Sequence, residues 1–419
     1  MKCINCKQKS FDKIISLGSQ PLSCKFPKFK KTIIKKYKLN LVKCNSCGLV
    51  QLDELVNPKE MYGEEYGYYS GISPMMKKHL NKIVKDHLSY IKNNSYILDI
   101  GSNDGTLLNA FFKYNKSLNL VGVDPNIKLF SDKYKKNIKK IPKLFDQNIT
   151  EDLNPYQIKF DLIFSIAMFY DISDPNSFIK LVKSLLSKNG IWVVELSYFK
   201  LLLENMTFDQ ICHEHIAYYN LIDLSKILKK HKLKIFNAKL NEINGGSIQV
   251  SISKSDSKYR ISPNFKKLIS EEKRGNDLNS FVSRVYSSKN TIYEVLKKLS
   301  KNNIIYGYGA STKGNIILNF LKINNKIVRK ICDANKFKLN RYTPGSKIQI
   351  ISKEQMRKEK PDYLFVLIWS FRREVIYQEK EYLKSGGKLI IPYPSMHIID
   401  KNNYKFFISR DLEDFAYKK

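Results

Sequence analysis

The chain lacks the segments that would insert it into a membrane or export it. It contains no apolar run of about 18 residues, the length that a transmembrane helix needs. Its first residues also lack the apolar stretch of a signal peptide. We therefore expect a cytoplasmic protein without a membrane partner. The composition does not distinguish a monomer from a homodimer.

Arginine is scarce in a chain that is otherwise strongly basic. The formal net charge is +34, yet only nine of the 73 basic residues are arginine. Surfaces that bind nucleic acid usually concentrate arginine, whose planar guanidinium pairs with phosphate and guanine. The lysines are spread over the whole chain, which is typical of a solvated surface and favours an anionic small-molecule substrate. We do not expect a nucleic-acid partner.

Cysteine is also scarce, but its placement is informative. Four of the seven cysteines form two Cys-x-x-Cys pairs near the start, namely Cys3, Cys6, Cys44 and Cys47. Each pair can hold one side of a metal ion, and two pairs supply the tetrahedral thiolates that zinc prefers. Unrelated thiols or two redox-active pairs are the alternatives. Four sulfur ligands leave no open position for a reactive water, so the expected zinc is structural.

Beyond the cysteine pairs, short apolar strands alternate with helical stretches, as in a parallel, doubly wound α/β sheet. The expected strands of a first sheet are residues 96–100, 118–124, 160–165, 190–195 and 233–236. A second α/β pattern begins near residue 303, with later strands at 327–332, 363–368 and 388–391. We divide the chain into three domains at residues 1–74, 75–290 and 291–419.

The loop after the first of these strands predicts a nucleoside-binding site. Its glycines let the backbone turn sharply into a helix, but it lacks the GxGxxG pattern of dinucleotide-binding loops. Asp124 ends the next strand, where its carboxylate can accept hydrogen bonds from two ribose hydroxyls. S-adenosylmethionine (SAM) carries no phosphate and tolerates carboxylates here, so we favour it over NAD or another nucleotide. The candidate cofactor residues are Asp99, Gly101, Asn103, Asp104, Gly105 and Asp124.

A His-Glu-His segment, His213-Glu214-His215, follows the expected strand 190–195 after a short insertion. In a doubly wound sheet, ligands gather at the carboxyl ends of the strands, so this segment is expected beside the cofactor. An imidazole oriented by a second group suits a general base. A metal site, or histidines that only pack and cap, are the competing interpretations.

Taken together, these motifs resemble the sugar C-methyltransferases that act on nucleotide-linked 4-keto-deoxyhexoses. The resemblance covers nearly the whole chain and includes the zinc pairs, the glycine loop, the His-Glu-His segment, Asn244-Gly-Gly-Ser and the 307–315 segment. It implies an α/β protein in which a class I methyltransferase domain lies between a small zinc-binding domain and a C-terminal Rossmann-like domain. The C-terminal domain would help to hold the nucleotide sugar.

The resemblance also implies roles for single residues. His215 would take the proton beside the ketone, while His213 and Glu214 support it and contact the sugar. The tyrosines around residues 62–69 would close over the ligands, with Tyr66 at the cofactor and Tyr68 at the substrate, or would only pack between domains. Cys212 stands where better-known members have tyrosine. That difference leaves open the sugar and the face that is attacked.

The glycines of the 307–314 loop would indicate NAD on pattern alone, but we favour a phosphate-binding turn without redox function. Lys313 and Arg341 are the candidates for the diphosphate, as a point charge and as a two-pronged donor. Asn244 is a further substrate candidate. We therefore expect C-methylation of a nucleotide-linked 4-ketosugar. O- or N-methylation of a nucleotide sugar and RNA methylation are the alternatives.

Overall fold

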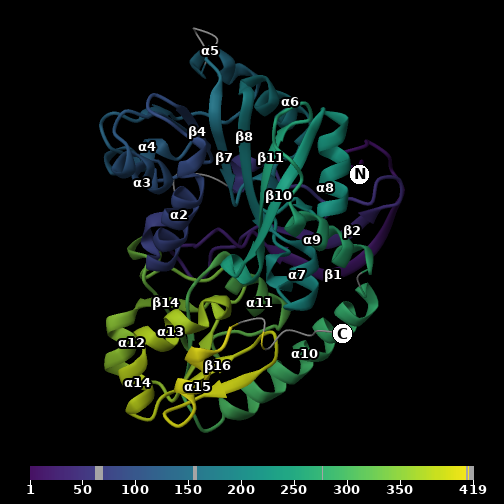
Figure 1. Ribbon diagram of the computed structural model, residues 1–419. Helices are drawn as coiled ribbons and strands as arrows, with labels where there is room; N and C mark the ends of the chain where they lie inside the picture. The colour runs from purple at the N-terminus through teal and green to yellow at the C-terminus, as the bar shows by residue number, and fades with distance from the viewer. Residues whose placement is uncertain (62–68, 154–157, 276, 412–413, 415–419) are drawn as a thin grey trace.

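The computed structural model describes residues 1–61, 69–153, 158–275, 277–411 and 414, and it contains three β-sheets (Figure 1). The large sheet and its helices form the upper part of the view, and the C-terminal sheet forms the lower part. The purple N-terminal strands lie beside the junction between these two parts. Tyr66 and Tyr68 lie outside the described residues.

The N-terminal sheet contains four antiparallel strands in the order β1-β2-β3-β9. Three belong to the first domain: β1 (Phe11–Pro21), β2 (Lys36–Cys44) and β3 (Val50–Leu52). The fourth, β9 (Ala217–Tyr218), comes from the middle of the chain and pairs with β3. The first domain is therefore built into the rest of the molecule through a shared sheet.

The large sheet has seven strands in the order β10-β11-β8-β7-β4-β5-β6. Five of them run parallel: β4 (Tyr96–Ile100), β5 (Asn119–Val123), β6 (Lys139–Ile141), β7 (Phe160–Ile166) and β8 (Leu186–Ser197). An antiparallel hairpin of β10 (Leu233–Asn241) and β11 (Ser247–Lys254) completes one edge. The expected strands therefore form one sheet of the doubly wound class.

Helices cover both faces of this sheet because alternate residues of its buried strands point to opposite sides. In β4, Ile97 belongs to a core shared with α2 (Pro74–His87) and α3 (Thr106–Tyr114). The next residue, Leu98, belongs to a core shared with α6 (Pro175–Leu185) and α8 (Leu221–Lys230). Each of these helices buries one apolar side against the sheet.

Two helices lead from this domain to the last one. They are α9 (Pro263–Lys273) and the long α10 (Leu278–Leu299), which descends along one side of the molecule (Figure 1). The expected boundary between residues 290 and 291 falls within α10. Shorter helices are α1 (Pro58–Met61), α4 (Ile127–Phe130), α5 (Thr150–Leu153) and α7 (Phe199–Glu204).

The C-terminal sheet has the order β14-β13-β12-β15-β16-β17, with only β17 antiparallel. Its strands are β12 (Ile305–Tyr308), β13 (Lys330–Asp333), β14 (Gln349–Ser352), β15 (Tyr363–Val366), β16 (Lys388–Ile391) and β17 (His397–Ile399). Its helices are α11 (Thr312–Phe320), α12 (Lys353–Glu359), α13 (Arg372–Gln378), α14 (Lys380–Lys384) and α15 (Tyr404–Ser409). This is the expected Rossmann-like arrangement.

Among the helices of the described residues, none has the length and apolar character needed to cross a bilayer.

Candidate active site and zinc site

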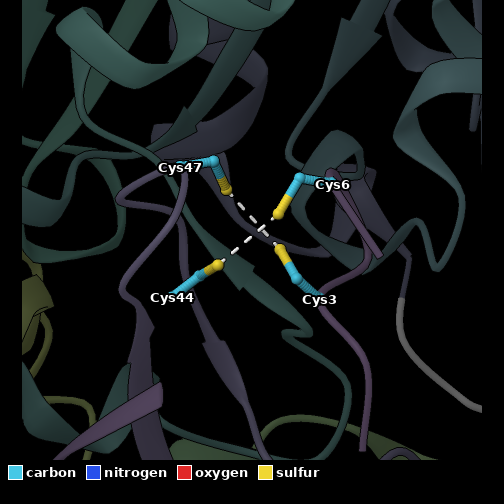
Figure 2. Close-up of side chains that lie close together, drawn as sticks. All are labelled: Cys3, Cys6, Cys44 and Cys47. Carbon is cyan, nitrogen blue, oxygen red and sulfur yellow. Dashed lines mark hydrogen bonds between the residues drawn. The ribbon is translucent and has the colours of Figure 1, made fainter. Parts of the chain in front are cut away.

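The four cysteines of the two Cys-x-x-Cys pairs converge on one point (Figure 2). The Sγ atoms of Cys3 and Cys47 are 3.6 Å apart, and those of Cys6 and Cys44 are 3.5 Å apart. Zinc–sulfur bonds of about 2.3 Å in a tetrahedron place sulfur atoms roughly 3.8 Å from one another. The observed spacing fits a zinc ion with four thiolate ligands.

The turn of the second pair depends on Gly48. Its N–H donates to the carbonyl of Cys44 at 2.9 Å, and its φ of +82° is one that side chains rarely adopt. A Cβ at this position would come within 3.0 Å of an Asp223 carboxylate oxygen. Glycine therefore serves both the turn and the contact with the methyltransferase domain.

The cofactor loop lies at the carboxyl ends of β4 and β5. Gly101 and Gly105 both have left-handed backbones, with φ of +75° and +72°. Asp124, at the end of β5, accepts from the N–H of Asn103 at 3.0 Å and from that of Asn126 at 2.7 Å. The predicted cofactor residues are thus brought together, and Asp124 also holds the loop in shape.

The electrostatics of this loop suit a cation. Burial, and then the charges of Asp124 and Asp104, raise the pKa of Asp99 well above its usual value. Burial also raises the pKa of Asp124. Gathered carboxyls repel one another, so a positively charged ligand would be stabilised and a diphosphate would be repelled. This loop therefore fits the sulfonium of SAM better than a dinucleotide.

A short helical turn at Ser70–Ile72, just before the methyltransferase domain, contacts this loop. The N–H of Ser70 donates to the Asn103 side chain, and the N–H of Gly71 donates to Asp104, each at 3.0 Å. Asp104 also accepts from the hydroxyl of Thr106 at 2.7 Å. Asn103 and Asp104 therefore use their side chains to fasten residues 70–71 against the loop.

The three residues of the His-Glu-His segment point to different surroundings. The ring of His213 is buried and lies against Tyr37 of β2, with centroids 6.1 Å apart. Glu214 is buried and accepts from the hydroxyl of Ser23 at 3.4 Å. His215 is the one member that is partly exposed, and its ring lies 4.4 Å from that of Tyr170. His215 is thus the member best placed to meet a ligand.

His215 and Lys313 lie in one site, although Lys313 belongs to the C-terminal domain. The His215 ring lies near the backbone of Gln210, and the Gln210 side chain donates to the carbonyl of Asn244. The Asn244 side chain accepts from Lys313 Nζ at 3.1 Å. Burial, and then the charge of Lys313, lower the pKa of His215 to about 3. His215 is therefore a neutral imidazole at neutral pH.

Carboxyl groups surround Lys313. Burial lowers the pKa of Lys313, and the charges of Asp209, Glu214 and Asp171 oppose that effect. Burial raises the pKa of Asp209 to about 6, and it raises those of Asp171 and Glu214 as well. Within the described residues, one buried oxygen each of Asp171 and Asp209 has no hydrogen-bond partner. These oxygens are unpaired acceptors close to Lys313.

A further predicted substrate residue, Arg341, belongs to the C-terminal domain and contacts the N-terminal domain. Its guanidinium donates to the carbonyl of Phe26 at 3.0 Å, and the next residue, Tyr342, donates its N–H to the carbonyl of Pro27. Arg341 thus fastens the C-terminal domain to the segment that follows β1.

Several site residues were not predicted from the sequence. Tyr170 and Asp171 follow β7, where the rule that ligands gather at carboxyl ends of strands would have indicated them. Glu195, near the end of β8, is buried and lies 2.7 Å from His79 Nε2. Its second oxygen accepts from Asn241 at 3.0 Å and from Gln249 at 3.2 Å. No local pattern indicates these pairings.

Comparison with known proteins agrees with this architecture. Three family models match consecutive parts of the chain: "Putative zinc binding domain" at residues 3–62, "Methyltransferase domain" at 75–237 and "C-methyltransferase C-terminal domain" at 242–394. The C-methyltransferase NovU of Streptomyces niveus is 27% identical over 408 residues, which cover 95% of this chain and 96% of NovU.

Other matches are confined to part of the chain. The tRNA U34 carboxymethyltransferase of Campylobacter lari is 33% identical over 119 residues, or 28% of this chain and 40% of that protein. A solved structure of the plantazolicin methyltransferase BpumL with SAH has a TM-score of 0.35 at 12% identity, covering 43% of this chain and 86% of that one.

The fold and the cofactor loop define a SAM-dependent methyltransferase of class I, and the four thiolates add a structural zinc site. The full-length match to NovU and the three family models in sequence make the assignment more specific. These matches agree with the resemblance to sugar C-methyltransferases that the motifs predicted.

Proposed function

We propose that the protein methylates a carbon beside the ketone of a nucleotide-linked 4-keto-deoxysugar, in the cytoplasm. The observation that carries this proposal is that Lys313, hydrogen-bonded to Asn244, acts with its charge on the His215 ring, which packs on Tyr170. A neutral base and a cation would thus share one site between two domains. Removal of a proton beside a ketone requires that pair, because the enolate oxygen gains charge as the proton leaves.

In this mechanism SAM supplies an electrophilic methyl group. His215 takes the proton from the carbon beside the ketone, and packing against the ring of Tyr170 orients its imidazole. The Nζ of Lys313, fixed by Asn244, stabilises the enolate oxygen. SAM held by the loop at residues 101–105 and by Asp124 would supply the methyl group to the enolate carbon, and S-adenosylhomocysteine would leave as the carbon–sulfur bond breaks. A site that holds both reactants close together supplies much of the remaining rate.

This proposal assigns Lys313 to the ketone rather than to the diphosphate. Asp171, Asp209 and Glu214 surround this lysine, and their carboxylates would repel a phosphate. The surroundings of Lys313 therefore disfavour binding of the diphosphate. The same oxygens can accept hydrogen bonds from sugar hydroxyls. The diphosphate is then left for other basic residues of the C-terminal domain, and Arg341 stays a candidate.

The test uses a panel of nucleotide 4-ketosugars with SAM, and it locates the new methyl group by NMR. A product methylated on carbon supports the proposal, and one methylated on oxygen or nitrogen contradicts it.

A second assay omits SAM and follows exchange of the substrate's acidic hydrogen with deuterated water. We expect exchange in the wild type. We expect a loss of about 10²- to 10⁴-fold in His215→Asn. His213→Asn is the matched control because its ring faces Tyr37.

A further inference from the structure

Gln51 connects the zinc site to the strand that follows the His-Glu-His segment. This residue is fully buried in β3. Its side-chain oxygen accepts from the N–H of Ile4 at 2.9 Å, and Ile4 lies between the two cysteines of the first pair. Its backbone lies opposite Ala217 of β9. One residue therefore contacts both the zinc-binding turn and the strand two residues beyond His215.

The connection continues on both sides of Gln51. The N–H of Leu52 donates to the carbonyl of Ile216 at 2.9 Å, and Ile216 directly follows His215. The N–H of Ile216 in turn donates to the carbonyl of Tyr170, whose ring packs on that of His215. The backbone on the C-terminal side of the base is thus held from both directions, by the zinc domain and by the loop after β7.

The zinc domain also holds the other members of the segment. Ser23 donates to Glu214, and its carbonyl accepts from the Asn315 side chain at 2.7 Å. Asn315 lies in α11, the helix that carries Lys313. The segment after β1 is therefore inserted between the His-Glu-His segment and the C-terminal domain. Three contacts with the segment, from β3, Tyr37 and Ser23, come from the N-terminal domain.

We propose that Gln51 is a positioning residue through which the first zinc-binding turn fixes the backbone beside His215. The zinc domain then serves turnover as well as folding, because a base that is displaced by about 1 Å can lose much of its rate. This inference rests on the proposed function in the role it gives to His215. Its structural part, that Gln51 orders residues 211–219, does not depend on the substrate.

The test compares Gln51→Met, which keeps the size but removes the acceptor for Ile4, with Asn45→Ala as the matched control. Asn45 lies in the second zinc-binding turn, and its side chain bonds only to Ser10 and Asp12 among its described hydrogen-bond partners. Zinc content, SAM affinity by calorimetry and amide hydrogen exchange are measured on each protein. Amide exchange is compared between residues 211–219 and the cofactor loop at 99–105.

We expect Gln51→Met to retain one zinc and to bind SAM as the wild type does, but to exchange amides faster across residues 211–219 only. With a 4-ketosugar, kcat and deuterium exchange should fall about 10- to 100-fold with little change in KM. Unchanged protection of 211–219 in Gln51→Met, or an equal loss in Asn45→Ala, would overturn the inference. If no 4-ketosugar reacts with the wild type, the proposed function fails while the amide-exchange comparison still decides this inference.

If Gln51→Met does not fold, stepwise removal of zinc from the wild type by a chelator replaces it. Faster amide exchange across residues 211–219 before SAM binding declines supports the inference. A simultaneous loss of protection in 211–219 and in the cofactor loop contradicts it, because the zinc domain would then act on the whole fold.

Discussion

Asp124 and Asp333 hold equivalent positions in two different domains. Asp124 follows β5 and accepts from the N–H of Asn103, in the loop after β4, at 3.0 Å. Asp333 ends β13 and accepts from the N–H of Ala310, in the loop after β12, at 2.7 Å. Each also accepts from the N–H two residues ahead, at 2.7 Å in both cases. The same local device therefore shapes both loops, and only one of them needs to bind the methyl donor.

This pairing gives a matched test of the cofactor site. Asp124→Ala should weaken SAM binding by about 1–3 kcal/mol, because the ribose loses its acceptor and the Asn103 amide loses its partner. Asp333→Ala makes the same change in the C-terminal domain and should leave SAM affinity unaltered. Isothermal titration calorimetry with SAM and with NAD measures both. Equal losses in the two variants, or tighter binding of NAD, would contradict the assignment of the loop at 101–105.

Zinc binding should depend on four cysteines and on no others. We expect one zinc per chain, lost in Cys44→Ser combined with Cys47→Ser, because two ligands cannot close a tetrahedral site. Elemental analysis of the purified protein gives the stoichiometry. Cys332→Ser is the control, since that thiol is buried in the C-terminal core away from the zinc site. Unaltered zinc content in the double variant would show that the metal is bound elsewhere.

Local sequence patterns predicted most strands of the two α/β sheets and the cofactor loop, but they missed β6, β11, β14 and β17. Strand β4 coincides with the expected residues 96–100, and the four cysteines meet as their spacing predicted. Both signals are carried by neighbouring residues, through apolar runs and through turns that place two ligands side by side.

Contacts between distant residues could not be read in this way. Val50 and Tyr218 are paired across two strands, and each lies three residues after a functional residue, Cys47 and His215. The strand β9 is only two residues long, too short for any periodicity to indicate it. The position of Lys313 beside His215 likewise depends on how two domains pack, which no local pattern encodes.

Replacing Cys212 by tyrosine, the residue of better-known family members, tests whether this position has room for a larger side chain. Its side chain is 1% exposed and belongs to the core that joins the N-terminal and C-terminal domains. We expect Cys212→Tyr to lower the free energy of unfolding by about 1–3 kcal/mol, the usual cost of overfilling a packed site. Urea denaturation measures it, with Cys212→Ser as the control of similar size. Equal stability of the tyrosine variant would reveal room for a phenol at the substrate.

The pH dependence of the reaction tests the pairing of His215 with Lys313. His215 accepts a proton only as the neutral imidazole, and burial together with the charge of Lys313 lowers its pKa to about 3. The protonated, inactive form should therefore appear only well below the ordinary histidine pKa of about 6.5. The acid limb of kcat/KM, which reports the free enzyme, should lie below that pH in the wild type.

Removal of the lysine charge should move this limb in a defined direction. In Lys313→Met the pKa of His215 should rise, so the acid limb should shift upward in pH. Loss of enolate stabilisation should also reduce kcat by about 10²- to 10³-fold. Lys313→Arg keeps the charge and should keep the limb at low pH, even if its larger head lowers the rate. The pH profiles of kcat/KM for the wild type and the two variants show whether Lys313 acts on His215. If Lys313 only bound the diphosphate, its replacement would change KM and leave the acid limb at the same pH.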